Sequence, residues 1–439
     1  MANLHSFSRR GLLLGGGVAM TTMALAACGE SKSASSSSTS SGASDAKVSL
    51  TFWGWAPGYK EAVELWNKKN PNTQVTWIAT EASRKIYPKM LTAVKANNAP
   101  DLAQVGYEAL PSFVIQDAVQ DIKEWAGDVD KNFTAAGAKS VNLGGAVYGI
   151  PVDTAPMAMI YKALLDSLKI KAPKTWDEFA SAARAVKKAD PKASLTYFSS
   201  DPNFLAGLVR QAGGRWYDVT DSTVKVIMTQ DAASRKVADF WQKLINEGSI
   251  PVHEGYTPQV YKQMNEDTLI SELYGIWDTA LIAQNVPKGK GKWAVAPLPE
   301  WPDRPGGADM GGSATVVLKG SKNAEAAARF ATWMSTDPQA VSILISKGGL
   351  WPASTTGLAN KALQKPDAFY SNDKVFVPFI DVAKNLKYDW VWGPTQVQAG
   401  QDMENNLVKV SKSYPITKAL ADTQESTLAK LKKQGIKVG

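Results

Sequence analysis

The sequence has little cysteine and histidine: Cys28 is the single cysteine among 439 residues, and His5 and His253 are the two histidines. A zinc site built from cysteine and histidine needs three or four such ligands, so we expect no metal. His253 is the one histidine beyond the N-terminal segment, and no Gly-x-Ser-x-Gly turn accompanies it. A Ser-His-Asp triad is therefore not indicated. We also expect no cofactor.

Long runs of one charge are missing as well. The chain has 49 Lys and Arg against 41 Asp and Glu, a net charge of +8, and no run of five like charges occurs. Nucleic-acid-binding proteins usually gather their basic residues on one face or helix, so we expect no nucleic-acid partner. A charged fraction of 21% with a hydrophobic fraction of 44% is typical of a soluble globular protein.

Residues 1–28 are typical of an export signal. Arg9 and Arg10 precede an apolar, glycine-rich stretch at 12–27, which is shorter than the roughly 20 residues that a helix needs to span a bilayer. The arginine pair fits the twin-arginine route, and an ordinary secretory signal fits equally well. The stretch ends in LAAC, which resembles the bacterial lipoprotein cleavage motif. We therefore predict cleavage before Cys28 and a lipid anchor on the extracytoplasmic face of the cell membrane.

The residues that follow divide into a tether and a folded part. Residues 29–46 are rich in serine and have no large apolar side chain, which predicts a flexible tether. The folded part then covers 47–439. This length exceeds the about 250–300 residues at which a single hydrophobic core stops growing, so we expect two lobes.

The beginning of the folded part alternates between strand and helix patterns. Strands are predicted at 48–53, 74–78 and 101–105, with helices from 59 and over 84–97 between them. This alternation predicts an α/β fold with a parallel sheet. Ligands of such sheets bind beyond the carboxyl ends of the strands, so the side chains that follow the strands should converge on one edge. They are Trp53, Trp55, Glu81, Tyr107 and Glu108.

Tryptophan is abundant, with 15 residues against 12 Phe and 13 Tyr. Trp241 and Trp333 belong to stripes of amphipathic helices, so we expect them in the core. A flat ring with a polar edge suits a sugar, whose C–H face packs on the indole while the N–H still donates. The alternative interpretation is that some rings anchor loops. The candidates without a helical stripe are Trp53, Trp55, Trp216, Trp277, Trp351, Trp390 and Trp392.

Eight stretches occur in a characteristic order along the chain: LTFWGW at 50–55, APDL at 99–102, VYGIPVDT at 147–154, MIYK at 159–162, PKTWDEF at 173–179, YGIW at 274–277, GGSA at 311–314 and GLWPA at 349–353. Together they resemble the extracellular solute-binding proteins of carbohydrate ABC importers, the family that includes maltodextrin-binding proteins. The resemblance runs from about residue 48 to the end of the chain.

The resemblance implies a two-lobe, periplasmic-binding-protein-like clamshell, with a mixed, mostly parallel sheet flanked by helices in each lobe. Three crossings between the lobes are expected near 153–156, 310–314 and 351–355. Lobe 1 would then hold 47–153 and 314–352, and lobe 2 would hold 154–313 and 353–439. The resemblance further implies a monomer that is not an enzyme and that delivers a sugar to membrane permease subunits.

The resemblance also implies a set of ligand contacts. Trp53, Trp55 and Tyr59 occupy the first loop, and Glu81 follows the second strand. Gly213-Gly-Arg-Trp-Tyr217 matches family members only loosely, which weakens Trp216 as a candidate. Seven candidate tryptophans and few basic residues near them predict a neutral oligosaccharide with several subsites. The further candidates are Tyr107, Glu108, Asp153, Trp277, Asp278, Gly311, Gly312, Trp351, Trp390 and Trp392.

Two alternatives remain open at this point. A glycoside hydrolase needs two carboxylates roughly 5–10 Å apart, and Glu81, Glu108, Asp153 and Asp278 are available. The same clamshell could instead bind a polyamine or another small solute, because aromatic rings and acids also suit a polycation. Salt separates the two ligand classes: polyamine affinity should fall steeply with ionic strength, whereas neutral sugar affinity should not.

Overall fold

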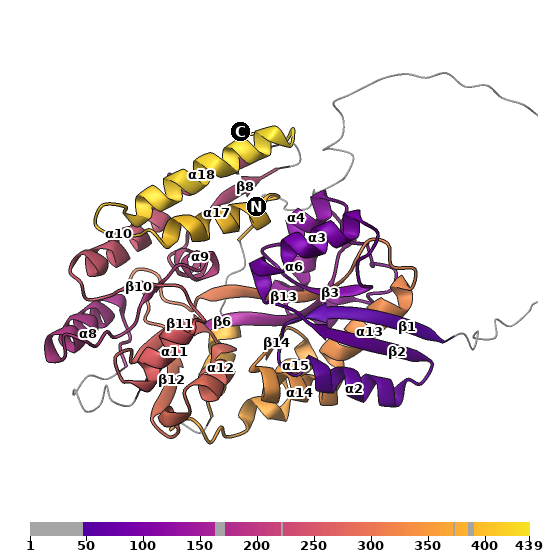
Figure 1. Cartoon of the computed structure of the whole chain (residues 1–439), viewed down its shortest axis with the longest axis horizontal. Helices are drawn as coiled ribbons and strands as arrows, with labels where there is room; N and C mark the ends of the chain where they lie inside the picture. Colours follow the sequence, from indigo (N-terminus) through magenta and orange to yellow (C-terminus); the bar gives the residue numbers. More distant parts are fainter. Residues whose placement is uncertain (1–46, 163–171, 221–222, 372–373, 385–389) are drawn as a thin grey trace, which may run out of the picture.

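The structure is a computed structural model that describes residues 47–162, 172–220, 223–371, 374–384 and 390–439. The export signal, Cys28 and the serine-rich tether lie outside the described residues. The buried apolar side chains form two separate clusters, which define two lobes (Figure 1). Lobe 1 surrounds the cluster that contains Leu50, and lobe 2 surrounds the cluster that contains Trp241.

Lobe 1 is built on three parallel strands, β1 (Val48–Gly54), β2 (Thr73–Ala79) and β3 (Leu102–Gly106), in the order β3–β1–β2. Alternate residues of β1 face the core, where Leu50 and Phe52 are almost completely buried. The predicted alternation of strands and helices is confirmed here, because burial on one face of a strand repeats every second residue.

Helices cover both faces of this sheet. Helix α2 (Tyr59–Lys69) joins β1 to β2, and helix α3 (Tyr87–Lys95) lies between β2 and β3 on the opposite face (Figure 1). Trp66 of α2 packs edge to face on Phe330 of α13 (Ala324–Thr336), with ring centroids 5.4 Å apart. Such aromatic packing fixes α2 and α13 against one another beneath the sheet.

Three strands carry the chain between the lobes. Strand β6 (Ile150–Lys162) pairs along its first half with β13 (Asp309–Val317), which itself pairs with β3 of lobe 1. The second half of β6 pairs with β11 (Ser271–Gly275) and β12 (Trp293–Pro297) in lobe 2. Strand β14 (Trp351–Pro352) pairs with the middle of β6. The three predicted crossings are therefore present, and they are hydrogen-bonded strands.

The close approach of β6 and β13 depends on Gly312. Its φ is +128°, and a Cβ placed on it would lie 2.2 Å from the carbonyl oxygen of Asp153. The register of the two strands also shifts next to this residue. Glycine is required here, because any side chain would collide with the backbone of β6 and would have to adopt a disfavoured φ.

Lobe 2 has fewer parallel pairings than the resemblance implied. Strands β11 and β12 both run antiparallel to β6, and the parallel pair described in this lobe is β7 (Phe198–Ser199) with β10 (Val252–His253). Strand β6 enters lobe 2 from lobe 1, whereas β11 and β12 run back and end beside Met157 and Ala158 at the junction. Neighbours that return toward the junction are necessarily antiparallel to β6.

The remaining elements complete the two lobes. Lobe 1 also contains η1 (Ser83–Lys85), α4 (Leu110–Ile115), α5 (Val129–Asn132), α6 (Ala135–Val141), β4 (Asn142–Leu143) and β5 (Ala146–Val147). Helix α14 (Pro338–Gly348), α15 (Thr355–Leu358) and η3 (Lys361–Gln364) lie near β14. Lobe 2 also contains α8 (Trp176–Ala189), α9 (Pro202–Gln211), β8 (Tyr217–Val219), β9 (Val224–Val226), α10 (Ala232–Asn246), α11 (Pro258–Asn265), α12 (Asp278–Asn285), η2 (Pro287–Gly289), α16 (Val377–Lys384), α17 (Gln396–Leu407) and α18 (Ile416–Lys433).

Helix α14 belongs to both cores. Leu344 packs in the core of lobe 1, while Val341 and Ile345 pack in the core of lobe 2. Trp351 likewise packs with lobe 2, although the proposed boundary assigns 314–352 to lobe 1. The segment near residue 352 is therefore a junction shared by the two lobes. We propose the division of the chain into 47–153 with 314–352 and 154–313 with 353–439.

The described ranges contain neither a candidate membrane span nor a candidate metal site. No helix in them is both long and apolar enough to cross a bilayer. They also contain no group of three or more His, Cys, Asp or Glu side chains that could hold a metal ion.

Replacing Gly312 by alanine should destabilise the junction of β6 and β13. We expect the free energy of unfolding to fall by about 3 kcal/mol, because the new methyl group collides with the Asp153 carbonyl oxygen. Gly311→Ala is the matched control, since φ there is +112° but nothing lies within 4 Å of the added Cβ. It should cost only about 1 kcal/mol. Equal losses in urea unfolding would contradict the collision.

Candidate functional site

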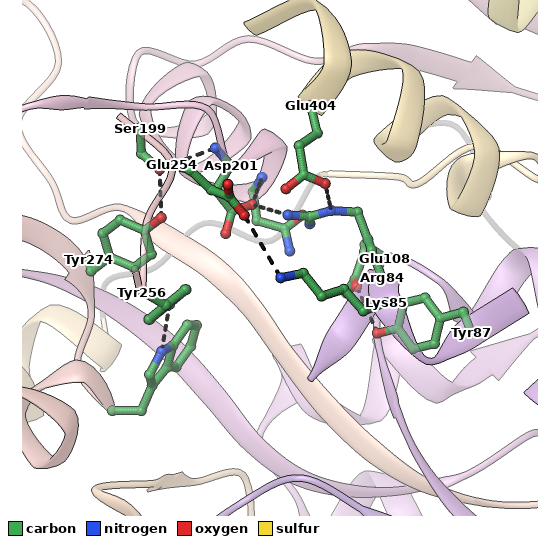
Figure 2. Close-up of polar contacts among 12 residues, drawn as sticks. Arg84, Lys85, Tyr87, Glu108, Ser199, Asp201, Glu254, Tyr256, Tyr274 and Glu404 are labelled. Carbon is green, nitrogen blue, oxygen red and sulfur yellow. Dashed lines mark hydrogen bonds and ion pairs between the residues drawn. The ribbon is translucent and has the colours of Figure 1, made fainter. Parts of the chain in front are cut away.

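Charged side chains of the two lobes meet around Arg84 (Figure 2). Arg84 lies in η1 of lobe 1; its Nη2 donates to Asp201 Oδ1 at 3.1 Å and its Nε donates to Glu404 Oε2 at 3.2 Å. Both acids belong to lobe 2, and the three side chains are 12%, 14% and 23% exposed. Burial alone would lower the pKa of Arg84, but the carboxylates of Asp201, Glu404 and Glu108 raise it above its ordinary value. These four residues form the interlobe cluster.

Glu108 is held in place from within lobe 1. The hydroxyl of Tyr87 donates to Glu108 Oε1 at 2.9 Å and accepts from the backbone N–H of Gly106 at 3.0 Å. Burial raises the pKa of Glu108, while Arg84 and Tyr87 oppose that rise. The ring of Trp55 packs edge to face on Tyr87, with centroids 6.3 Å apart. An aromatic ring and a fixed carboxyl group therefore lie next to each other on the lobe 1 side.

Three aromatic residues of lobe 2 form an aromatic wall: Tyr256, Tyr274 and Trp277. Trp277 Nε1 donates to the Tyr256 hydroxyl at 3.0 Å, and the rings of Tyr256 and Tyr274 are perpendicular with centroids 5.0 Å apart. The Tyr274 hydroxyl shares a 2.6 Å hydrogen bond with Ser199 Oγ. Trp277 is partly buried and packs against the cores of both lobes, so this wall lies at the boundary between them.

The ends of strands bring these residues together. In lobe 1, η1 follows β2 and Glu108 follows β3; in lobe 2, Asp201 follows β7, Tyr256 follows β10 and Trp277 follows β11. Asp201 also caps α9, because its carboxylate accepts from the backbone N–H of Asn203 at 2.8 Å. The site therefore lies beyond the carboxyl ends of strands, where α/β sheets place their ligands.

Three of the predicted contacts lie at this boundary: Trp55, Glu108 and Trp277. Other predicted contacts point elsewhere. Glu81 is exposed and follows β2. Trp53 lines a groove of about 810 Å³ between β1 and α3, where the ammonium of Lys89 lies 5.3 Å from the ring centre. Trp53 faces α3 because successive side chains of a strand point to opposite faces and Phe52 occupies the inner one.

Several predicted contacts are buried inside a lobe. Trp216 is fully buried and donates from Nε1 to Ser234 Oγ at 3.2 Å, while Trp390 and Trp392 pack against its ring. Asp278 is also fully buried, and burial together with Glu272 raises its pKa well above the ordinary value. Glu108 is also buried, but it interacts with Arg84 at the boundary between the lobes. The following candidates are buried within a single lobe, so the structure argues against them as contacts: Tyr59, Tyr107, Trp216, Asp278, Trp351, Trp390 and Trp392.

The remaining candidates lie at the junction of the lobes. Asp153 of β6 accepts from the backbone N–H of Ser313 at 2.9 Å and from its hydroxyl at 2.6 Å. Gly311 and Gly312 begin the part of β13 that passes Asp153. These three residues connect the lobes, and their contacts are with the backbone and side chains of the junction itself.

Sequence patterns contain little signal for the residues that the structure adds to the site. Arg84 stands at the start of a predicted helix, and Glu404 is one of two acids in the helix over 396–407. Asp201 precedes a proline, which is typical of a helix N-cap and does not indicate a ligand. Tyr256 and Tyr274 carry no sequence signal of a site. Their rings meet only in the folded protein, where the end of β10 lies near β11.

The geometry agrees with a comparison of the whole chain with known families. The sequence model described as bacterial extracellular solute-binding protein matches residues 54–341, which is more than half of the chain. The chain therefore belongs to this family, which acts by binding a solute outside the cytoplasm and does not catalyse a reaction.

Individual relatives and solved structures are similar to this chain over most of its length. The arabinooligosaccharide-binding protein of Bacillus subtilis is 26% identical over 84% of this chain and 86% of its own length. Among solved structures, the galacto-N-biose-/lacto-N-biose I-binding protein of Bifidobacterium longum, in complex with lacto-N-biose, is 28% identical, with a TM-score of 0.80 over 90% of this chain and 99% of that one. An ABC-transporter-associated binding protein of B. animalis subsp. lactis Bl-04, in complex with β-1,6-galactobiose, is 26% identical, with a TM-score of 0.79 over 89% and 99%. The two-lobe fold is thus shared with these binding proteins.

The buried Asp153 should make stability depend on pH. Burial raises the pKa of Asp153 to about 7, although the two hydrogen bonds from Ser313 lower it. The folded protein then binds more protons than the unfolded chain between about pH 4 and 7, so the wild type loses stability as pH rises through this window. Asp153→Asn cannot ionise, and its free energy of unfolding relative to wild type should rise by about 2–4 kcal/mol from about pH 4 to about pH 8.

Urea unfolding across this pH range checks the prediction. Asp130→Asn, which replaces an exposed carboxylate, is the control and should run parallel to the wild type at every pH. A constant difference between Asp153→Asn and the wild type would show that Asp153 does not titrate in this window.

Proposed function

We propose that the chain is the substrate-binding protein of an ABC importer and that it captures a neutral oligosaccharide between its lobes. The observation that carries this proposal is the arrangement in Figure 2, where the interlobe cluster and the aromatic wall meet at the boundary of the lobes. A sugar needs rings for its C–H faces and charged acceptors or donors for its hydroxyl groups. Residues of both types are present, and they come from both lobes.

The relatives support a sugar as the ligand. They include an arabinooligosaccharide-binding protein and binding proteins in complex with lacto-N-biose and β-1,6-galactobiose, which are all neutral saccharides. Glu108 and Trp55 would contact the sugar from lobe 1, and Trp277 with Tyr256 would contact it from lobe 2. A ligand held by both lobes favours the closed clamshell, which is the state that signals occupancy to a permease.

A polyamine is a weaker candidate on the geometry. A polycation needs carboxylates whose charge is available, whereas Asp201 and Glu404 are already paired with Arg84, and Glu254 lies 3.8 Å from the ammonium of Lys85. The cluster therefore presents paired charges, which suit the hydroxyl groups of an uncharged ligand better than an extended cation.

The N-terminal segment bears on where the protein acts. We propose that Cys28 carries the lipid anchor, that 29–46 tether the folded part to the membrane, and that a monomer delivers the sugar to ABC permease subunits. An export signal followed by a cysteine and a serine-rich segment supports the anchor. Extracytoplasmic location is a property of the family.

Trp277→Ala should weaken sugar binding by about 1–3 kcal/mol, because it removes an aromatic face at the boundary of the lobes. The measurement is calorimetry with arabinooligosaccharides, β-1,6-galactobiose and lacto-N-biose. Trp53→Ala is the matched control, since Trp53 lines the groove beside α3, and its affinity should equal that of the wild type. Binding of spermidine but of no sugar would contradict the proposed ligand class. No gain in affinity from a monosaccharide to a trisaccharide would contradict an oligosaccharide.

Cys28→Ser should release the protein from the membrane, because no thiol remains to be acylated. Fractionation of expressing cells should find the wild type with the membrane and the variant in the soluble extracytoplasmic fraction. Ser35→Ala, in the tether, should stay with the membrane. A variant that remains membrane-bound would contradict the anchor while leaving the sugar proposal intact.

A further inference from the structure

The contacts of Arg84 have a property that the proposed function does not require: they connect one lobe to the other. Both acids that accept from Arg84 lie in lobe 2, whereas Arg84 itself lies in lobe 1. All three side chains are largely buried. The acids also come from separate parts of lobe 2, since Asp201 caps the N-terminus of α9 and Glu404 lies in α17. An opening of the clamshell that separates η1 from α9 and α17 must therefore break both ion pairs.

We infer that Arg84 is a positioning residue that holds the two lobes together by charge. Opening exposes the separated charges to ions in the solvent, so salt favours the open state even when the ligand is uncharged. The effect on closure needs no ligand, whereas the effect on sugar affinity rests on the proposed function. A protein that binds sugar only when closed has an apparent affinity proportional to its closed fraction, so salt that opens the lobes weakens the binding of a neutral sugar.

Glu108 explains how Arg84 tolerates opening. Its carboxylate belongs to lobe 1, interacts with Arg84 and is fixed by Tyr87, so it stays beside the guanidinium when the lobe 2 acids move away. A buried cation without any partner would be very unfavourable, and Glu108 prevents that state. Gly400 of α17 leaves room on the other side, because a Cβ there would lie 3.3 Å from Arg84 Cδ.

Neighbouring contacts between the lobes are less sensitive to salt. Ser112 Oγ of α4 donates to the carbonyl oxygen of Pro394 at 3.0 Å and accepts from the N–H of Val397 at 3.1 Å, and neither contact involves a net charge. Lys85 and Glu254 are 3.8 Å apart, with side chains 68% and 50% exposed. Such an exposed and loose pair contributes little. The salt dependence should therefore come mainly from Arg84.

A salt-sensitive closure changes what the salt dependence of ligand affinity indicates. In the wild type, a fall in affinity with ionic strength no longer indicates a charged ligand, because closure itself responds to salt. In Arg84→Gln the two explanations separate: the affinity for a neutral sugar should become independent of salt, and the affinity for a polyamine should still fall.

Small-angle X-ray scattering without ligand tests the effect on closure. At about 0.02 M salt the radius of gyration of Arg84→Gln should exceed that of the wild type, and raising salt to about 0.5 M should expand the wild type but not the variant. Arg184→Gln is the matched control: it removes an exposed arginine that pairs with Glu247 at 2.7 Å on the surface of lobe 2, and it should behave as the wild type. Equal radii for Arg84→Gln and the wild type at both salt concentrations would overturn the inference.

Two further measurements keep the test decisive. If Arg84→Gln does not fold, as judged by circular dichroism, Glu404→Gln removes one of the two pairs and should show about half of the expansion; no expansion in it would also overturn the inference. Calorimetry with an arabinooligosaccharide and β-1,6-galactobiose should give an about five- to tenfold weaker wild-type affinity at high salt. The wild-type affinity at low salt decides the proposed function: absence of sugar binding there contradicts that proposal, whereas scattering alone decides the role of Arg84.

Discussion

Strands β6 and β13 run side by side through the junction of the lobes, and their antiparallel pairing extends from Ile150 and Thr315 in lobe 1 to Pro156 and Asp309 in lobe 2. Gly312 permits this approach, because its missing side chain leaves space for the carbonyl group of Asp153. Each lobe builds its sheet outward from these strands. The positions of the loops that follow β2, β3, β7, β10 and β11 depend on that pairing, and so does their meeting at one boundary.

Ion pairs connect the lobes in addition to the strands of the junction. The junction strands connect the lobes, and the interlobe cluster pairs Arg84 of lobe 1 with Asp201, the N-cap of α9, and with Glu404 of α17. The attraction of Arg84 to two carboxylates favours the closed arrangement. It also sets the geometry, because a guanidinium with fixed donor directions accepts only one relative position of the lobes. A sugar between the same lobes would favour the same position.

The aromatic residues show both the strength and the limit of sequence reasoning. Trp277 follows a strand and lies at the boundary of the lobes, close to where its motif placed it. Trp216, Trp390 and Trp392 had no helical stripe either, yet they pack on one another inside lobe 2. A large ring gains more by burial than any other side chain, and irregular segments can supply a core as well as a helix can. Lack of periodicity therefore does not distinguish a core tryptophan from an exposed one.

The sequence by itself determined the class of this protein: the alternating pattern, the length and the ordered motifs predicted a two-lobe α/β fold with three crossings, because these depend on local patterning and chain order. It also indicated that Glu108 and Trp277 follow strands, and Trp277 ends the YGIW stretch at 274–277. Only the tertiary structure decided that Arg84 meets Asp201 and Glu404, which lie 117 and 320 residues further along the chain. No local pattern encodes such a contact, because it exists only when two separately folded lobes are brought together by β6 and β13.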